Sequence, residues 1–435
     1  MSRKIFIIGI ILIFVACTMQ AQDLLTIDRA IEIGLSNNYG INIAKNSQKI
    51  SINNATPGNA GMLPKIDVNA GYAHGLSNAK VSNLAGYELE NSKANSDLFT
   101  AGINLNWTVF DGLKMFITYD KLKKLEEIGD LNVKISVERT LARIMAAYYE
   151  IIRQEKETEI MKDQVGISEF RLELARLKYE TGSGSELEYL KAKVELNADI
   201  ANLSSQKTVS MNSLATLNEL MAREVTSKFA VKDTILISYK LNYDSLRAGM
   251  RESNRNLLLY NRNVDVSTLD MKSARAVQWP TIGLTTGINY LNNQTEANIV
   301  NYNRNFGAVV GVTAYMNIFD GLNLQRDYRN AKISYASSEL EVKQLENQLE
   351  AHLLRIYNEY LNQLELLTFE KENVTLADKN MDIAKESFEV GAISSLQLRE
   401  IQKNLLDANT RLVDAEFRTK LTETALLLIS GKLLK

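Results

Sequence analysis

The spacing of apolar residues changes along the chain between two periods. From residues 113 to 179, and again from 322 to 390, apolar positions recur every three or four residues, as at Leu349, Leu353 and Ile356. This spacing places one buried stripe along an α-helix. The second stretch contains neither glycine nor proline, and a helix of about 66 residues would be roughly 100 Å long. The pattern therefore predicts two unusually long helices.

Each long stretch ends at a glycine turn, YETGSGSE in one case and FEVGAISS in the other. Gly182 and Gly391 suit the left-handed position that closes a helix. Ser185 and Ser394 are each followed three residues later by Glu or Gln, which is a capping-box pattern for a new helix. The sequence thus predicts two long helical hairpins, at about 112–222 and about 321–430.

A period of two precedes each hairpin and indicates β-strands. Apolar and small polar residues alternate in four segments, at about 64–74, 100–110, 280–291 and 306–319. Each segment has about the length of a tilted membrane strand, but alternation fits a soluble sandwich equally well. Aromatic residues at strand ends, Tyr72 and Tyr290 among them, favour a membrane girdle. The segments 75–99 and 291–305 are rich in Asn, Ser and Gly and are expected to be exposed loops.

The chain is an internal duplication. The tetrapeptide FDGL occurs at 110–113 and again 209 residues later, and the same offset holds without insertion through both glycine turns. Upstream, LPKIDVNAGY resembles WPTIGLTTGINY at an offset of 216. A repeat must be recognised before domains are counted. We assign residues 22–230 to a first repeat and 231–435 to a second, each with a short helix pair, a strand hairpin and a long helical hairpin.

The first residues predict export. Arg3 and Lys4 precede a short apolar run, and Ala21 is a small residue suited to cleavage, so residues 1–21 are expected to be a signal peptide. The alternative is a lipoprotein signal in which Cys17 carries the lipid. Phe14 fits that alternative poorly.

Composition excludes several classes of function. Cys17 is the only cysteine, and His74 and His352 are the only histidines, so we expect no metal site, no cofactor and no catalytic constellation. The formal net charge of −2 argues against a nucleic-acid partner. No segment after the signal has the 18 consecutive apolar residues of a membrane helix.

The motif at each strand-to-helix exit has a physical explanation. Gly112 and Gly321 permit a sharp change of backbone direction. Asp111 and Asp320 are placed to cap the helix that follows. The exit residues are Phe110, Asp111, Gly112, Phe319, Asp320 and Gly321.

Four strands cannot close a barrel, and an open edge cannot face lipid. Several chains must therefore share one barrel. The duplicated plan, the FDG exits and the YETG and FEVG turns together resemble the TolC-like outer-membrane efflux protein family over nearly the whole mature chain. The resemblance implies a mainly α fold with a small β part, in which a homotrimer closes a 12-stranded β-barrel on an α-helical barrel.

The same resemblance implies the function. The protein would be a passive exit duct in the outer-membrane lipid, serving a tripartite efflux or type I secretion system. A periplasmic adaptor and an inner-membrane pump, of the RND or ABC class, would open it at its periplasmic tip.

The resemblance also implies site residues. The gate of the tip aperture would consist of Gln397 and Glu400, where the family pattern has two acidic residues and this chain retains one. The hairpin tips that face the adaptor would consist of Gly182, Ser183, Gly184, Gly391, Ala392 and Ile393.

The competing hypothesis is a periplasmic adaptor or a structural coiled-coil protein without a pore. Adaptors carry a single long hairpin between soluble β-domains, whereas this chain has two hairpins with strand pairs between helices. An enzyme is a third hypothesis, and no catalytic group supports it. The sequence leaves the cargo, the pump class and any ligand of the segments 75–99 and 291–305 open.

Overall fold

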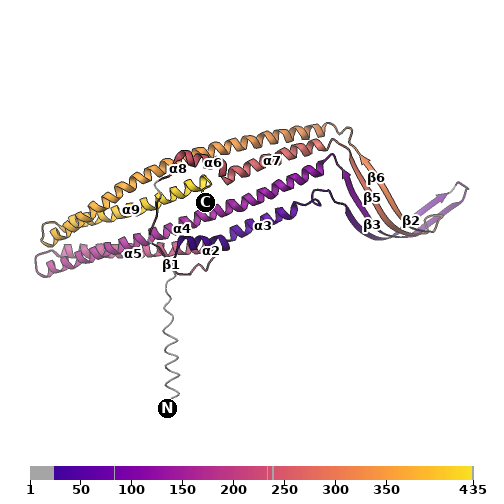
Figure 1. Cartoon of the computed structure of the whole chain (residues 1–435). Helices are drawn as coiled ribbons and strands as arrows, with labels where there is room; N and C mark the ends of the chain where they lie inside the picture. Colours follow the sequence, from indigo (N-terminus) through magenta and orange to yellow (C-terminus); the bar gives the residue numbers. More distant parts are fainter. Residues whose placement is uncertain (1–23, 83, 233, 238–239, 434–435) are drawn as a thin grey trace, which may run out of the picture. The chain divides into compact units, whose positions relative to one another are not determined.

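The computed structural model describes residues 24–82, 84–232, 234–237 and 240–433. The expected signal peptide 1–21 and Cys17 lie outside these residues. Figure 1 shows long helices and a curved sheet. The elements in chain order are β1 (Leu24–Leu25), α2 (Ile27–Asn37), α3 (Tyr39–Asn54), β2 (Lys65–Ser82), β3 (Glu88–Phe110), α4 (Lys114–Glu180), α5 (Glu186–Leu220), β4 (Ala230–Val231), α6 (Tyr243–Ser253), α7 (Arg255–Ala276), β5 (Thr281–Thr295), β6 (Tyr302–Tyr315), α8 (Asn323–Glu389) and α9 (Ser395–Ile429).

The duplication is visible in the lengths of the elements. Helices α4 and α8 each have 67 residues, and α5 and α9 each have 35. Each pair keeps the offset of 209 seen in the sequence. The short helices α2 and α6 each have 11 residues and keep the upstream offset of 216. The predicted mainly α fold with two long hairpins and four longer strands is confirmed, and the parallel pair β1–β4 was not predicted.

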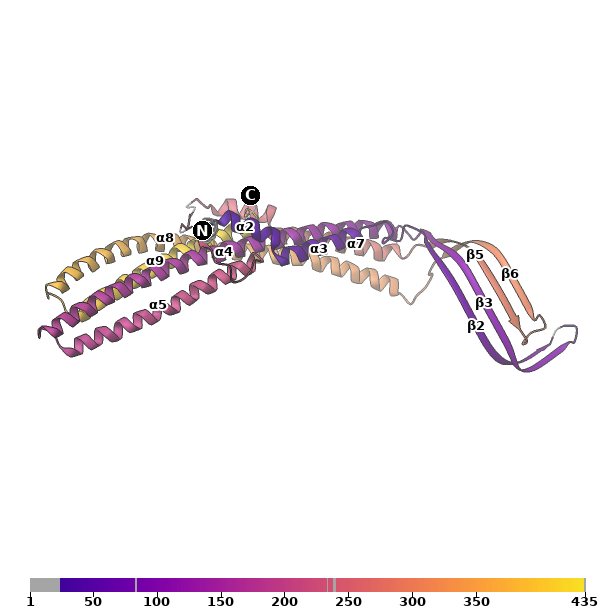
Figure 2. The same cartoon turned by 90° about the horizontal axis from the view of Figure 1, so that it is seen from below.

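The four long strands form one antiparallel sheet in the order β2–β3–β5–β6. Figure 2 shows the hairpin β2–β3 extending past β5 and β6. The expected loop 75–99 is therefore wrong, because β2 continues to Ser82 and β3 begins at Glu88. The expected loop 291–305 is also wrong, since β5 reaches Thr295 and β6 starts at Tyr302. Polar residues typical of loops are accommodated here because the backbone groups that face the other strand of the hairpin find partners in it.

The predicted strand 306–319 ends earlier than expected. The last pair of the β5–β6 ladder joins Thr281 to Tyr315, so residues 316–319 have no strand beside them. Met316, Ile318 and Phe319 are exposed. In the first repeat β3 continues to Phe110, because Ile282 of β5 still pairs with it beyond a bulge. The repeats differ here because β6 is at the edge of the sheet and β3 is inside it.

The chain divides into two compact units that do not coincide with the sequence repeats. Unit 1 contains residues 1–45, 133–258 and 344–435, and unit 2 contains residues 46–132 and 259–343. Both repeats contribute to both units. Unit 2 holds the sheet and the first parts of α4 and α8, and unit 1 holds the rest of the long hairpins with the three apolar clusters.

Two equivalent cores fill unit 1, one for each repeat. The first is built around Ile144, Tyr148 and Leu217, which are at most 2% exposed. The second is built around Leu353, Tyr360 and Leu426. These residues occupy the three-and-four stripe of the sequence, so the stripes are buried where the hairpins pack.

An asparagine ties each short helix pair to the end of a return helix. Asn38, between α2 and α3, donates a 2.9 Å hydrogen bond to the carbonyl of Leu220 and accepts one from the Ile41 N–H. Asn254, between α6 and α7, makes the same pair of bonds to Ile429 and Leu257. Each side chain satisfies one carbonyl at a helix C-terminus and one N–H at a helix start, groups that helices leave unpaired.

A tyrosine makes a second repeated contact. The Tyr148 hydroxyl donates to the Leu25 carbonyl at 2.9 Å and accepts from the Lys232 N–H at 3.2 Å, so it joins both strands of the small parallel pair. Tyr357, its counterpart, contacts the Leu241 carbonyl at 3.5 Å and is half-buried. None of the described helices carries an apolar stretch long enough to cross a membrane.

We expect Tyr148→Phe to lower the free energy of unfolding by about 1–3 kcal/mol, because the buried Leu25 carbonyl and the part-buried Lys232 N–H lose their partner. Urea unfolding in detergent, followed by helix content, measures this change. Tyr357→Phe is the matched control, and it should cost clearly less because its bond is at the limiting length. Equal losses in the two variants would contradict the role given to Tyr148.

Candidate functional site

The two hairpin turns have the same backbone geometry. Gly182 and Gly391 have φ values of +72° and +78°, in the left-handed region. The Ser183 N–H bonds to the Lys178 carbonyl at 2.9 Å, and 209 residues later the Ala392 N–H bonds to the Ser387 carbonyl at 2.8 Å. The predicted tip residues Gly182, Ser183, Gly391 and Ala392 are exposed, and Gly184 and Ile393 are half-buried.

The two predicted gate residues have different surroundings. Gln397 completes a capping box at the start of α9: its side chain accepts from the Ser394 N–H at 2.8 Å, and its own N–H bonds to the Ser394 hydroxyl. Glu400 is exposed one turn later. The side chain of Gln397 thus caps the start of α9. The carboxylate of Glu400 faces solvent.

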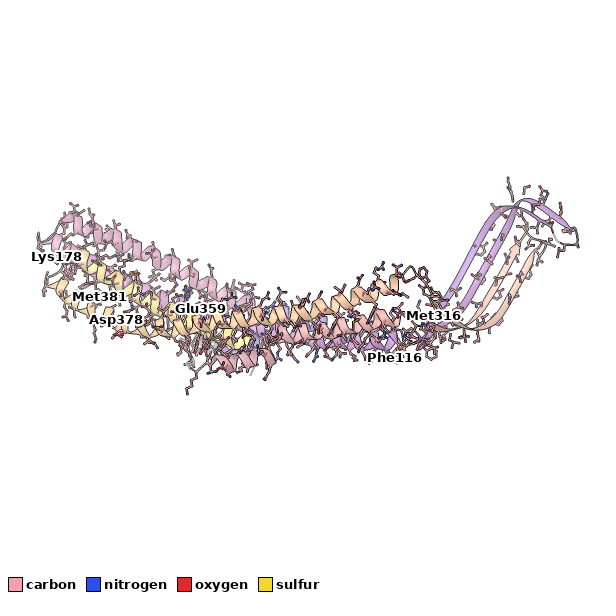
Figure 3. All side chains as sticks on the ribbon, turned by 90° about the horizontal axis from the view of Figure 1, so that it is seen from above. Phe116, Lys178, Met316, Glu359, Asp378 and Met381 are labelled. Atoms are coloured by element: carbon pink, nitrogen blue, oxygen red, sulfur yellow. The ribbon has the colours of Figure 1, made fainter. Side chains whose placement is uncertain are left out.

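An apolar cluster packs the second hairpin against α4 near the turns. Met381, Ala384, Phe388 and Leu398 are buried together, with Ile167, Phe170 and Leu174 of α4 against them. Met381 and Lys178 are labelled on neighbouring helices in Figure 3. The Lys178 ammonium lies 4.6 Å from the centre of the Phe388 ring, a cation–π contact between the hairpins.

A buried polar cluster, here called the tip network, joins α4, α5 and α9 beside this apolar cluster. Its members are Ser168, Arg171, Glu195, Asp199, Arg399 and Gln402. Arg399 of α9 holds both carboxylate oxygens of Asp199 on α5, at 2.7 and 3.0 Å. Ser168 donates to the same carboxylate at 2.6 Å. A bidentate pair of this kind fixes geometry as well as adding attraction.

Arg171 is the most deeply buried charge of the tip network. It is 3% exposed, donates to Glu195 at 2.7 Å and to Gln402 at 3.1 Å, and leaves its Nε without a partner. Burial lowers the pKa of Arg171, and the bond to Glu195 opposes that shift. By contrast, hydrogen bonding to Asp199 raises the pKa of Arg399. Both guanidinium groups stay charged, so separating α9 from the first hairpin would leave buried charges unpaired.

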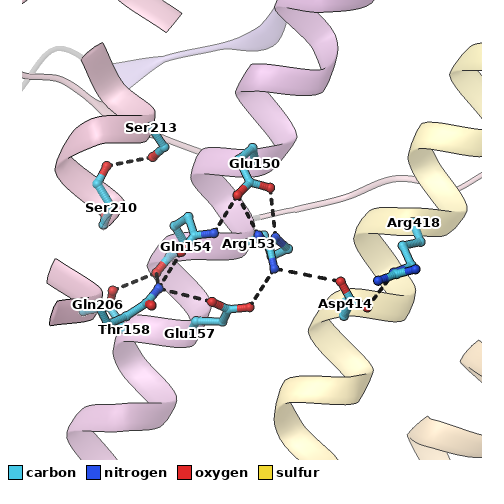
Figure 4. Close-up of polar contacts among 10 residues, drawn as sticks. All are labelled: Glu150, Arg153, Gln154, Glu157, Thr158, Gln206, Ser210, Ser213, Asp414 and Arg418. Atoms are coloured by element: carbon cyan, nitrogen blue, oxygen red, sulfur yellow. Dashed lines mark hydrogen bonds and ion pairs between the residues drawn. The ribbon is translucent and has the colours of Figure 1, made fainter. Parts of the chain in front are cut away.

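A second polar cluster joins the same three helices further from the turns (Figure 4). Arg153 bonds to Glu150 and Glu157 at 2.7 and 3.0 Å, and lies 3.9 Å from Asp414 of α9. Gln206 of α5 donates to Glu157 at 3.2 Å. Burial raises the pKa of Glu157, while Arg153 partly offsets the shift. This cluster also connects the first hairpin to α9, and it does so through polar contacts rather than apolar ones.

A cavity of about 410 Å³ opens beside the tip network, between α5 and the start of α9. Its apolar lining comes from Leu187, Leu190, Val194 and Leu396, three of which are more than 60% exposed. Its polar lining includes Arg171 and Glu195. An apolar hollow bordered by charges suits a side chain from another protein better than a chemical step.

The strand-to-helix exits repeat one geometry in unit 2. Gly112 and Leu113 both have positive φ, and so do Gly321 and Leu322. Asp111 accepts from the Met115 N–H at 3.1 Å, and Asp320 accepts from the Leu324 N–H at 2.9 Å. Phe110 is half-buried, whereas Phe319 is exposed. These residues redirect the backbone and belong to unit 2, whereas the tips and the gate residues belong to unit 1.

Sequence reasoning missed the tip network. None of its six residues was predicted as a site residue. The available signal was the buried stripe of α4, where Gln164, Ser168 and Arg171 follow one another at spacings of four and three. Polar residues at stripe positions must find buried partners, which indicates a network between helices.

A family model described as outer membrane efflux protein matches residues 35–223 and 248–432. The chain belongs to this family. The two matched segments correspond to the two repeats, so each repeat carries the family pattern separately. Its members are outer-membrane channels, and the outer membrane is the location of this protein.

Similar sequences and similar solved structures agree with this family assignment. The outer membrane protein TolC of Vibrio cholerae serotype O1 is 22% identical over 367 residues, covering 83% of this chain and 80% of the relative. The outer membrane efflux protein BepC of Brucella suis biovar 1 is 20% identical, covering 77% and 72%. The Campylobacter jejuni CmeC outer membrane channel has the same fold, with a TM-score of 0.78, 14% identity and coverage of 94% of this chain and 86% of that one.

The tip network yields a test. Asp199→Asn leaves the guanidinium of Arg399 without its bidentate partner, which should cost on the order of 2–3 kcal/mol locally, somewhat less than a fully buried pair. Hydrogen exchange measured by mass spectrometry should then be faster in residues 395–405. Arg418→Gln is the control, because that arginine is 59% exposed and its pair with Asp414 should contribute little. Unchanged exchange in Asp199→Asn would contradict the proposed tie.

Proposed function

We propose that the protein is a passive trimeric channel and the exit duct of a tripartite efflux or type I secretion system. A periplasmic adaptor and an inner-membrane pump, of the RND or ABC class, open it at the hairpin tips. The channel catalyses no reaction.

The free edges of the sheet carry this proposal. Strands β2 and β6 are each paired on one side only within the chain. One face of the sheet exposes large apolar side chains, including Ile66, Val68, Val310 and Val312, at 64–77%. Apolar side chains in lipid require a closed ladder, because unpaired backbone groups there cost several kcal/mol each. Pairing β2 of one chain with β6 of the next closes a twelve-stranded barrel from three chains.

Two features of the helical hairpins support opening at the tips. The tip network and the cluster in Figure 4 hold α9 against the first hairpin through charges that could be exchanged for other partners. The cavity beside the network presents leucines and a valine to solvent. An adaptor that fills this cavity would compete with Arg171 and Arg399 for their present partners, and α9 could then move away.

A periplasmic adaptor, or a coiled-coil protein without a pore, is the competing function. It would leave the apolar face of the sheet in water, and contiguous apolar patches of that size are rare on soluble monomers. The number of chains in the native assembly distinguishes the channel from this competing function.

The native mass of the detergent-extracted protein, with bound detergent subtracted, tests the shared barrel. We expect three chains, because four strands leave two open edges. A stably folded single chain would refute both the barrel and the channel.

The charge at the gate gives a second test. In the trimer, Glu400 would form a ring of three carboxylates, which favours cations. We expect Glu400→Lys to lower the cation-to-anion permeability ratio severalfold, as measured by the reversal potential in a planar bilayer. Glu372→Lys adds the same charge at another exposed glutamate of the second hairpin and should have little effect. An unchanged reversal potential in Glu400→Lys would exclude the gate role.

A further inference from the structure

The face of the sheet opposite the apolar one carries mostly small, uncharged polar residues and glycines. Across the four strands one register row reads Asn69, Gly102, Asn289, Gly307, and the next reads Asp67, Asn104, Gly287, Val309. Two further rows read Lys65, Asn106, Thr285, Gly311 and Thr108, Gly283, Thr313. Glycines thus alternate with amide or hydroxyl side chains along and across this face.

The polar side chains lie over the glycines. A Cβ atom added at Gly102 or Gly287 would collide with the amide oxygen of Asn289 or Asn104, respectively. At Gly283 and Gly311 it would meet the hydroxyls of Thr313 and Thr285 within 3.1 Å. Those hydroxyls also donate to the carbonyls of the same glycines at 3.4 Å. The side chains are therefore laid along the sheet instead of projecting from it.

The same face has almost no net charge. Its only ionised side chains in these rows are Lys65 and Asp67, which pair at 2.9 Å. Asn104 donates to Asn69 at 2.8 Å, so amides also satisfy one another. A hollow of about 350 Å³, lined by Asn104, Thr285 and Asn289 among others, lies on this face.

We propose that this face is a smooth lumen wall with almost no net charge, which keeps the barrel wide and passes bulky polar solutes of either charge sign. The inference rests on the proposed trimer, in which the apolar face meets lipid and this face turns inward. A charged wall would retard one sign of solute, and aromatic or apolar patches would retain amphipathic ones. Asn–Gly and Thr–Gly pairs neither retard charged solutes nor retain amphipathic ones. The glycines also keep the lumen wide, because side chains in their place would project into it.

A thiol reporter in the wall tests this without passing the tip. Cys17 is the only cysteine and lies in the expected signal peptide, so Asn106→Cys is the single thiol of the mature chain. Asn106 is exposed on the polar face, in a row nearer the helices than Gly102. Intact outer membranes are treated from outside with maleimide-polyethylene glycols of graded mass, and the largest mass that labels is recorded.

We expect Gly102→Asn to lower this size limit, because the new side chain cannot share the space of Asn289 and must project. The double variant Gly102→Asn/Asn289→Gly has the parent's composition and should recover most of the limit. If Gly102→Asn prevents assembly, Gly311→Thr and Gly311→Thr/Thr285→Gly give the same comparison with a strand-compatible side chain.

The outcomes separate the two levels of the proposal. A size limit that falls in the single variant and recovers in the double supports the wall. A size limit that stays the same in Gly102→Asn and in Gly311→Thr overturns the wall while keeping the enclosed lumen. If every maleimide-polyethylene glycol labels the parent Asn106→Cys variant, the face is not enclosed. That result would also refute the trimeric barrel.

Discussion

The backbone groups along the outer edges of β2 and β6 impose the constraint on which the rest of the proposed assembly depends. Inside a bilayer no water can hydrogen-bond them, so they must find partners in protein. The chain supplies only four strands to the sheet, and the apolar face of that sheet is unsuited to water. In the proposed trimer the membrane part is therefore complete only after the chains have met, so that folding of the sheet and association are one process.

The helical part meets a different requirement, because its hairpins are held by side chains rather than by backbone ladders. Apolar stripes fill the cores around Tyr148 and Tyr360. Near the turns, charge pairs such as Arg399–Asp199 join the hairpins next to the apolar cluster of Phe388. Apolar packing is non-directional, whereas a bidentate pair specifies one arrangement. This division suits the proposed opening at the tips, because a polar pair can exchange its partner while the apolar cores stay packed.

Much of the architecture could be predicted from the sequence, because the signals were periodic. The 3.6 period and the unbroken offset located both hairpins, and the period of two located four strands. Errors came where composition and pairing disagree. Asn- and Ser-rich segments were predicted as loops yet pair as strands up to Ser82, and Ile318 continued an alternation that β5 does not support. The tip network was missed because its partners lie 24 to 234 residues apart, and only folding brings them together.

The equal lengths of α4 and α8, and of α5 and α9, have an evolutionary consequence. A single inserted codon in one long helix would rotate its stripe by about 100° and displace its tip by about 1.5 Å relative to the other copy. The two repeats can therefore diverge in sequence, but the lengths of their long helices are constrained. This explains why FDGL and the glycine turns still stand 209 residues apart in halves whose other residues have mostly diverged. Relatives of this chain should vary in length mainly in the strand hairpins and the segments between the repeats, where an added residue rotates no helix.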